Sequence, residues 1–204
     1  MLKKAILLFF IVIVCCVALV QNDWFWDIIA PVCYEDVVYK YAQRYEIDPI
    51  LASAIIKVES SFYSDAQSPK GAIGLMQIMP STGKEIASKL NLRPFLISDL
   101  YAPEINIQIG LYYFVMLKKE FNGDLYLSLA AYNGGRKNVK RWLSQKKINL
   151  QNSKEDIKNI PFKETREFVQ NVMLNYQWLK FTHKIRNWLQ FKKDKEKSTD
   201  CTDG

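Results

Sequence analysis

The stretch DPILASAIIKVESSF, residues 48–62, fixes the first helix that can be placed and with it the character of the fold. Asp48 is a favoured N-cap residue and Pro49 suits the first helical position, so a helix is predicted to begin there. Apolar side chains then recur every four residues in two neighbouring rows, Ile50-Ala54-Val58 and Leu51-Ile55-Glu59. The pattern predicts a buried helix with one apolar row that ends on a carboxylic acid.

Helical spacing continues along almost the whole chain from Cys33 onward. Residues 61–74 interrupt it and are predicted to form a loop, since they include Pro69, Gly71 and Gly74. The fold class is therefore mainly α, a compact helical domain with at most a small irregular β-hairpin near residues 72–77. Besides the helix at residue 49 and an apolar stripe over residues 37–45, helices are predicted at 81–90, 104–121, 125–132, 137–144 and 164–188.

The first 21 residues have the form of an export signal. Lys3 and Lys4 precede an unbroken apolar run over residues 5–20. Removal after Ala18 and retention as an N-terminal membrane anchor both remain open, because the run is slightly shorter than a bilayer span. We therefore expect an exported protein of the periplasm or cell envelope, with residues 1–21 as leader and 22–190 as the catalytic domain.

Charge and cysteine content add two expectations. The net charge of +7 indicates affinity for polyanions in general, and residues 191–204 are predicted to be a charged, disordered tail. After removal of the leader, Cys33 and Cys201 are the remaining thiols. They could pair in an oxidising compartment, or Cys33 could be a core residue and Cys201 a free thiol.

Several chemistries are disfavoured by the sequence. His183 is the one histidine and has no metal ligand at a suitable spacing, so neither a zinc site nor a histidine-based nucleophile is expected. Phosphate-binding glycine loops and nucleic-acid motifs are absent, so we expect no cofactor and no nucleic-acid partner. Carboxylate chemistry remains, and Glu59 suits it because packing against an apolar row raises the pKa of a carboxyl group.

Four blocks of sequence carry a resemblance to a known family. ESSF at 59–62 is followed by SPKGAIGLMQIMPST at 68–82, then by AAYNGG at 130–135 and IPFKETREFV at 160–169. In this order and at about this spacing, they resemble the soluble lytic transglycosylases over about residues 33–180. Any one block alone would be weak evidence. Phe62 and Phe168 depart mildly from the family pattern, and no large accessory domain is present, which leaves the substrate range open.

The resemblance implies a fold similar to goose-type lysozymes and a reaction on peptidoglycan. Such enzymes cut the bond between N-acetylmuramic acid and N-acetylglucosamine without water and leave 1,6-anhydro ends. Glu59 matches the family's catalytic glutamate, acting first as acid and then as base. The expected substrate-binding positions are Ser68, Gln77, Met79, Tyr132, Asn133 and Glu164.

Alternatives from the same fold stay open at this point. One is a muramidase that admits water and yields reducing ends, and another is a non-catalytic peptidoglycan-binding module. The sequence near Glu59 offers no second carboxylate, which the transglycosylase reaction does not need because the nucleophile belongs to the substrate. We expect a monomer that contacts the membrane through an uncleaved leader alone. General wall remodelling, service to a cell-envelope secretion complex and a phage role all remain open.

Overall fold

The computed structural model describes residues 2–20, 22, 25, 26, 28, 32–149 and 152–200, with backbone alone for residues 2, 3, 16, 17 and 192–200. The chain divides into two compact units, which we describe separately. One comprises Met1–Cys33 together with Trp178–Gly204, and the other is Tyr34–Gln177. Every site residue predicted above lies in the second unit.

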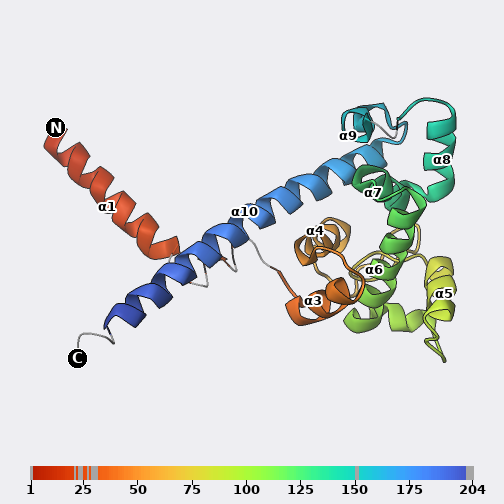
Figure 1. Cartoon of the computed structure of the whole chain (residues 1–204), viewed down its shortest axis with the longest axis horizontal. Helices are drawn as coiled ribbons and strands as arrows, with labels where there is room; N and C mark the ends of the chain where they lie inside the picture. Colours follow the sequence, from red (N-terminus) through yellow and green to blue (C-terminus); the bar gives the residue numbers. More distant parts are fainter. Residues whose placement is uncertain are drawn as a thin grey trace. The chain divides into compact units, whose positions relative to one another are not determined.

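The second unit is built from helices (Figure 1). They are α3 (Glu35–Arg44), α4 (Pro49–Ser60), α5 (Pro80–Lys89), η1 (Ile97–Tyr101), α6 (Pro103–Glu120), α7 (Leu125–Gly134), α8 (Arg136–Ser144), α9 (Ser153–Asp156), η3 (Ile157–Asn159) and the first half of α10 (Lys163–Asp200). Within the described residues there are isolated β-bridges and no sheet. The predicted mainly α fold is therefore confirmed.

The first unit contains α1 (Leu2–Val20) and the part of α10 from Trp178 onward. The apolar side chains of α1 at residues 6–14 are exposed. Among the described residues, no helix combines the length and apolar character that a bilayer crossing requires. Cys33 is exposed, so it is not a core residue. Cys201 lies outside the described residues, so the pairing of Cys33 with Cys201 stays untested.

Helix α10 is longer than the predicted helix 164–188 and is helical to Asp200. The predicted start of the tail at residue 191 therefore falls inside this helix, and residues 201–204 lie outside the described residues. The leader and the boundaries at 21 and 190 stay predictions.

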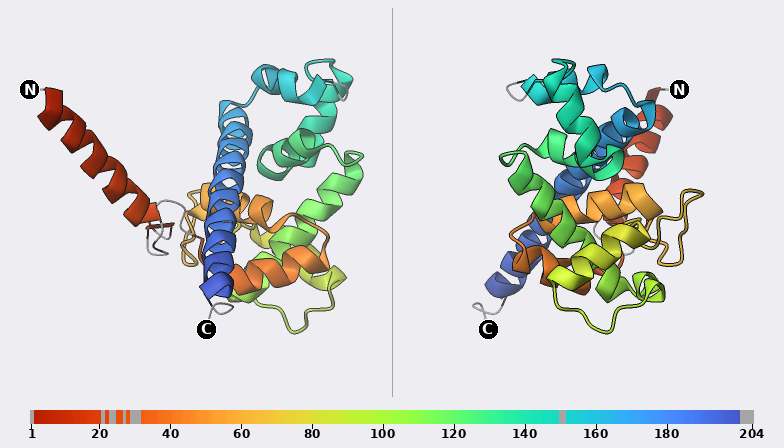
Figure 2. Two further views of the ribbon diagram at one scale, coloured as in Figure 1. Left: turned by 60° about the vertical axis from the view of Figure 1, so that its left-hand side comes forward. Right: turned by 90° about the vertical axis from the view of Figure 1, so that its right-hand side faces the viewer.

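Helix α6 lies at the centre of the second unit, in contact with α3, α5, α7 and η1 (Figure 2). Its residues Ile107, Ile109, Leu111 and Phe114 are fully buried. Asn106 is also fully buried, and its side chain holds three main-chain groups in place. Its oxygen accepts from Met76 N at 2.7 Å, and its nitrogen donates to Ile73 O at 2.9 Å and to Leu100 O at 2.7 Å. One amide therefore anchors the loop before α5 to the helical core.

That loop runs from the end of α4 to the start of α5 and forms two antiparallel bridges, Gln67 with Ile73 and Ile73 with Ile78. The small irregular hairpin expected near residues 72–77 is present. Gly74 has a φ of +77°, and a Cβ atom there would overlap the Asn106 amide and the Leu100 carbonyl oxygen. A side chain is therefore excluded at this position by both backbone conformation and space.

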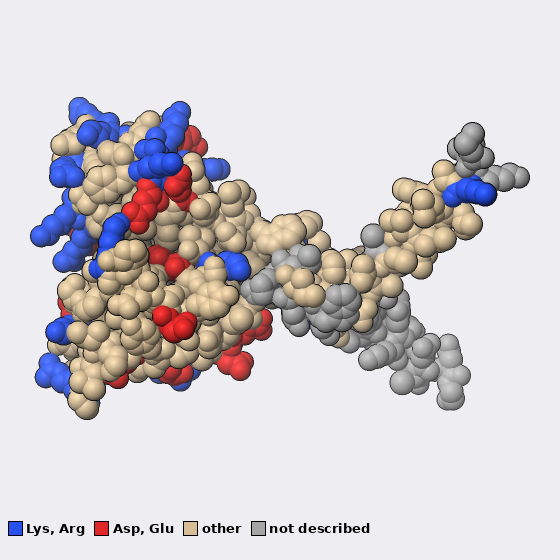
Figure 3. All heavy atoms as spheres, turned by 180° about the vertical axis from the view of Figure 1, so that it is seen from behind, with Lys and Arg blue, Asp and Glu red and all other residues tan. Residues whose placement is uncertain are grey.

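Charge is mixed on the surface of this unit. On the face drawn in Figure 3, basic side chains are frequent along the left and upper edges, and acidic side chains lie in the middle and along the lower edge. The two signs of charge are therefore interspersed on this face.

Candidate active site

Helix α4 presents Glu59 at its C-terminal end. The Asp48 side chain accepts a hydrogen bond from Ile50 N at 2.8 Å and Pro49 occupies the first turn, as the sequence predicted. At the other end, Ser60 Oγ donates to Ile56 O and accepts from Phe62 N, each at 3.2 Å. These bonds end the helix one residue after Glu59, so its side chain emerges where the chain turns into the loop.

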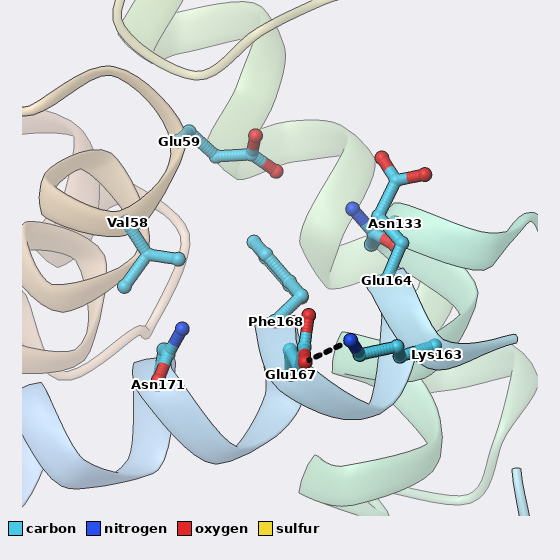
Figure 4. A pocket seen from close by; sticks show the side chains of 8 residues that line it. All are labelled: Val58, Glu59, Asn133, Lys163, Glu164, Glu167, Phe168 and Asn171. Atoms are coloured by element: carbon cyan, nitrogen blue, oxygen red, sulfur yellow. Dashed lines mark ion pairs between the residues drawn. The ribbon is translucent and has the colours of Figure 1, made fainter.

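Glu59 lies in the wall of a pocket of about 430 Å³ (Figure 4). The pocket lies between the end of α4, the end of α7 and the first turns of α10. Glu59 and Phe168 project into it from opposite sides. Its lining consists of Val58, Glu59, Asn133, Lys163, Glu164, Glu167, Phe168 and Asn171.

The environment of Glu59 disfavours its charged form. Burial of the carboxyl group, aided by the negative charge of Glu164, raises the pKa of Glu59 from an ordinary value near 4.5 to about 8. A carboxyl group with this pKa is largely protonated at neutral pH and can donate a proton there.

Tyr132 is not one of the residues that line the pocket, but it lies close enough to Glu59 to feel its charge. Its hydroxyl donates to Met76 O at 2.7 Å, which ties α7 to the loop, and its ring stacks on Phe168 at a centroid distance of 6.4 Å. Burial, and then the charge of Glu59, raise the pKa of Tyr132 well above its usual value, so this hydroxyl keeps its proton. Tyr132 is therefore a neutral hydrogen-bond donor within electrostatic reach of Glu59.

Asn133 and Glu164, both predicted as groove residues, line the same pocket as Glu59. Asn133 Oδ1 accepts a hydrogen bond at 2.9 Å from the buried hydroxyl of Thr165, a residue of α10. This bond fixes the orientation of the Asn133 side-chain amide. Glu164 forms an exposed ion pair with Lys70 at 2.7 Å.

The structure places the other predicted residues outside the pocket lining. Ser68 Oγ accepts from Ala72 N at 3.0 Å, and Gln77 Nε2 donates to Ala66 O at 3.1 Å and Gly74 O at 2.9 Å. Both side chains therefore shape the loop. Met79 is 40% exposed at the start of α5, which does not fit a role in filling the core.

Sequence reasoning missed several lining residues on α10. Residues Lys163, Glu167, Phe168 and Asn171 belong to the pocket, together with Val58 on α4. Glu164, Glu167, Phe168 and Asn171 are spaced by three, one and three residues, so they share one helical face, and that spacing was a usable signal.

Two further carboxylates thus reach the pocket from a segment about 100 residues distant in sequence. Glu167 is ion-paired with Lys163 at 3.6 Å, just as Glu164 is with Lys70. The local sequence around Glu59 offers no second carboxylate, but the folded pocket contains two more, Glu164 and Glu167.

The described part of the chain contains no group of three or more His, Cys, Asp or Glu residues placed to hold a metal ion. His183 lies on α10, exposed and beside Asn187. The raised pKa of Glu59 suits the pocket to acid–base chemistry.

The fold is a lysozyme-like helical domain, and a buried glutamate at the wall of its pocket is an arrangement suited to general acid–base chemistry. A family model described as the Transglycosylase SLT domain matches residues 36–155. The chain belongs to this family.

Known relatives agree with this assignment. The soluble lytic murein transglycosylase of Escherichia coli K12 is 35% identical over 144 residues, which cover 70% of this chain and 22% of that one. Membrane-bound lytic murein transglycosylase C of Edwardsiella ictaluri is 34% identical, covering 71% of this chain and 46% of the relative. The solved lytic transglycosylase Slt of Pseudomonas aeruginosa, an inactive glutamate-to-glutamine mutant, superimposes with a TM-score of 0.67 at 36% identity, covering 76% of this chain and 25% of that one.

The chain thus spans about a quarter of the length of the first of these relatives and of the solved structure.

Proposed function

We propose that this protein is a peptidoglycan lytic transglycosylase that cleaves the β-1,4 bond between N-acetylmuramic acid and N-acetylglucosamine. The observation that carries the proposal is the raised pKa of Glu59, to about 8, at the wall of an open pocket in an SLT-family domain. Burial of an ionisable group costs stability, and a pure binding module gains nothing in return for that cost, whereas a general acid needs the raised pKa that burial produces.

The reaction uses Glu59 twice. The protonated carboxyl group donates its proton to the glycosidic oxygen as the bond from that oxygen to C1 of the muramic acid breaks. The resulting carboxylate then takes the proton from the 6-hydroxyl of the same sugar, whose oxygen bonds to C1. Glu59 ends protonated as it began, no water is consumed, and the product is a 1,6-anhydro end.

The supporting residues divide into two roles under this proposal. Asn133 and Glu164 contact the glycan strand from the pocket wall, and Tyr132 acts from outside the lining by holding the loop to α7 through its hydrogen bond to Met76 O. Ser68, Gln77 and Met79 act through the loop, since Ser68 and Gln77 bond to its main chain. Glu164 and Glu167 are exposed and each forms an ion pair with a lysine, so we assign the proton donation to the buried Glu59.

We place the protein in the cell envelope, where its substrate lies. The relatives bear the names soluble and membrane-bound lytic murein transglycosylase, and the apolar N-terminal run is compatible with export.

The test is digestion of purified sacculi by the full chain in water enriched in oxygen-18, with fragments analysed by mass spectrometry. Wild type should release anhydro ends without heavy oxygen, and Glu59→Gln should be slower by about 10²- to 10⁴-fold. Glu155→Gln, an exposed glutamate on α9 outside the pocket, should match wild type. Reducing ends that carry oxygen-18 would instead identify a muramidase, and equal rates for wild type and Glu59→Gln would remove Glu59 from the mechanism.

A further inference from the structure

The part of α10 in the first unit has large apolar side chains on its exposed side. Trp178, Phe181, Ile185 and Trp188 follow one another at intervals of three, four and three residues, so they lie on one face of the helix. Trp178 is 46% exposed, Phe181 56% and Trp188 54%. Leu179 and Thr182, on another side of the same helix, are buried. The exposed stripe is therefore separate from the face that packs.

The charged side chains of this segment are all basic as far as residue 193. Between Glu167 and Asp194 the sequence contains no acidic residue, whereas residues 178–193 contain the basic side chains Lys180, Lys184, Arg186, Lys192 and Lys193. Lys184 lies three residues after Phe181 and four before Trp188, so it borders the aromatic stripe. Lys180 lies one turn earlier on the same border, and both lysines are exposed.

From these observations we propose that the stripe Trp178–Trp188, with its lysine border, binds the surface of an anionic lipid membrane. Tryptophan favours the boundary between water and hydrocarbon because its ring is apolar and its N–H is polar. Lysine beside it is attracted to negatively charged headgroups. An apolar stripe bordered by basic residues is the composition of a helix that lies in the membrane interface.

A second copy of the chain is a poorer occupant of the same stripe. The 3–4 spacing could in principle form a helix-to-helix seam, but self-pairing would bring Lys180 and Lys184 of both copies together along its edge. Like charges at such flanking positions oppose association. An anionic surface neutralises the same lysines, so charge complementarity selects lipid.

The experiment measures insertion at the stripe itself, because α1 is also apolar and could retain the full chain on a vesicle. Full-length protein is mixed with vesicles of phosphatidylglycerol and phosphatidylcholine whose acyl chains carry bromine, a quencher of tryptophan fluorescence. The quenched signal of wild type should exceed that of Trp178→Phe/Trp188→Phe, since both tryptophans enter the lipid. Equal quenching of the two proteins would overturn the proposal.

A matched pair of charge variants tests the lysine border. Lys180→Gln/Lys184→Gln should raise the phosphatidylglycerol concentration for half-maximal quenching of Trp178 and Trp188 by about 30-fold, since each basic residue near the surface is worth about a fivefold change. Lys154→Gln/Lys158→Gln removes the same charge from exposed positions in the second unit and should leave the half-maximal concentration unchanged. The proposal would be contradicted if both pairs of variants shifted the half-maximal concentration equally, or if vesicles of pure phosphatidylcholine quenched the wild type as strongly as the anionic vesicles do. It would also be contradicted if the wild type associated with itself without lipid and Trp178→Phe/Trp188→Phe did not.

Discussion

At the scale of single residues, we expect the protonation of Glu59 to govern both activity and stability. Under the proposed mechanism the competent form is the protonated acid, and the pKa of Glu59 is about 8. We expect kcat/KM on a soluble glycan to be level through neutral pH and to fall tenfold per pH unit above about pH 8. A profile that rises with pH through this range would show that the carboxylate, and not the acid, starts the reaction.

The neighbour Glu164 should set the position of this alkaline limb. Its negative charge contributes to the raised pKa of Glu59, so Glu164→Gln should shift the limb to lower pH. Glu167→Gln is the matched control, because Glu167 also lines the pocket and does not contribute to that shift. The measurement is the pH profile of both variants on the same substrate, and a shift shared by both variants would contradict a specific role for Glu164.

The same carboxyl group should destabilise the fold as pH rises. The pKa of Glu59 is higher in the folded protein than in the unfolded chain, so the folded protein binds more protons between these two values. The free energy of unfolding therefore falls as the pH rises from about 4.5 to about 8. Glu59→Gln never ionises and should therefore be more stable than wild type by on the order of 3 kcal/mol at pH 7, and by little below about pH 4.5. Urea melts of both proteins across this range provide the check, and a constant difference would count against a buried acid.

At the scale of elements, the loop between α4 and α5 depends on the absence of a side chain at Gly74. Gly74→Ala should cost more than about 2 kcal/mol and displace the loop, because the new methyl group would overlap Asn106 and Leu100. Gly71→Ala is the matched control: Gly71 also has a positive φ, of +84°, but a Cβ atom there meets nothing within 4 Å. The free energy of unfolding of Gly71→Ala should fall by about 1–2 kcal/mol, from the backbone conformation alone. Equal losses in thermal melts would show that space at Gly74 is not the cause.

The start of α4 is tied to α10 by one hydrogen bond. The Tyr176 hydroxyl donates to Asp48 Oδ2 at 2.6 Å, and burial together with this bond raises the pKa of Tyr176 to about 12. Asp48 is also the N-cap of α4, so its two carboxylate oxygens serve both helices. The helix that carries Glu59 is thereby positioned relative to the helix that supplies the opposite wall of the pocket.

At the scale of the whole molecule, the sequence predicted most helices of the second unit to within a few residues, because caps, prolines and glycines mark their ends. It did not predict η1 or α9 with η3, which are too short for a helical period to be recognised. It placed Glu59, Asn133 and Glu164 in one site through family motifs. Glu167 and Asn171 share a helical face with Glu164, and this spacing could have indicated them, but their approach to Glu59 joins segments over 100 residues apart and is not encoded in local sequence.

The two units should separate in a truncation experiment. A stop codon in place of Trp178 removes the proposed lipid-binding stripe but retains Thr165, Phe168, Val169 and Val172, the buried residues with which α10 enters the core of the second unit. The truncated protein should keep its melting temperature within about 3 °C of that of wild type, as measured by thermal denaturation. A large fall in melting temperature would show that the second unit depends on the rest of α10.

The bonds that shape the pocket have a consequence for how the site tolerates acid and alkali. Asn106 holds the loop, Tyr132 joins it to α7, and Thr165 orients Asn133. Amides and hydroxyls such as these neither gain nor lose a proton under the conditions in which Glu59 ionises. The framework around Glu59 can therefore stay in place while that one group cycles between acid and base.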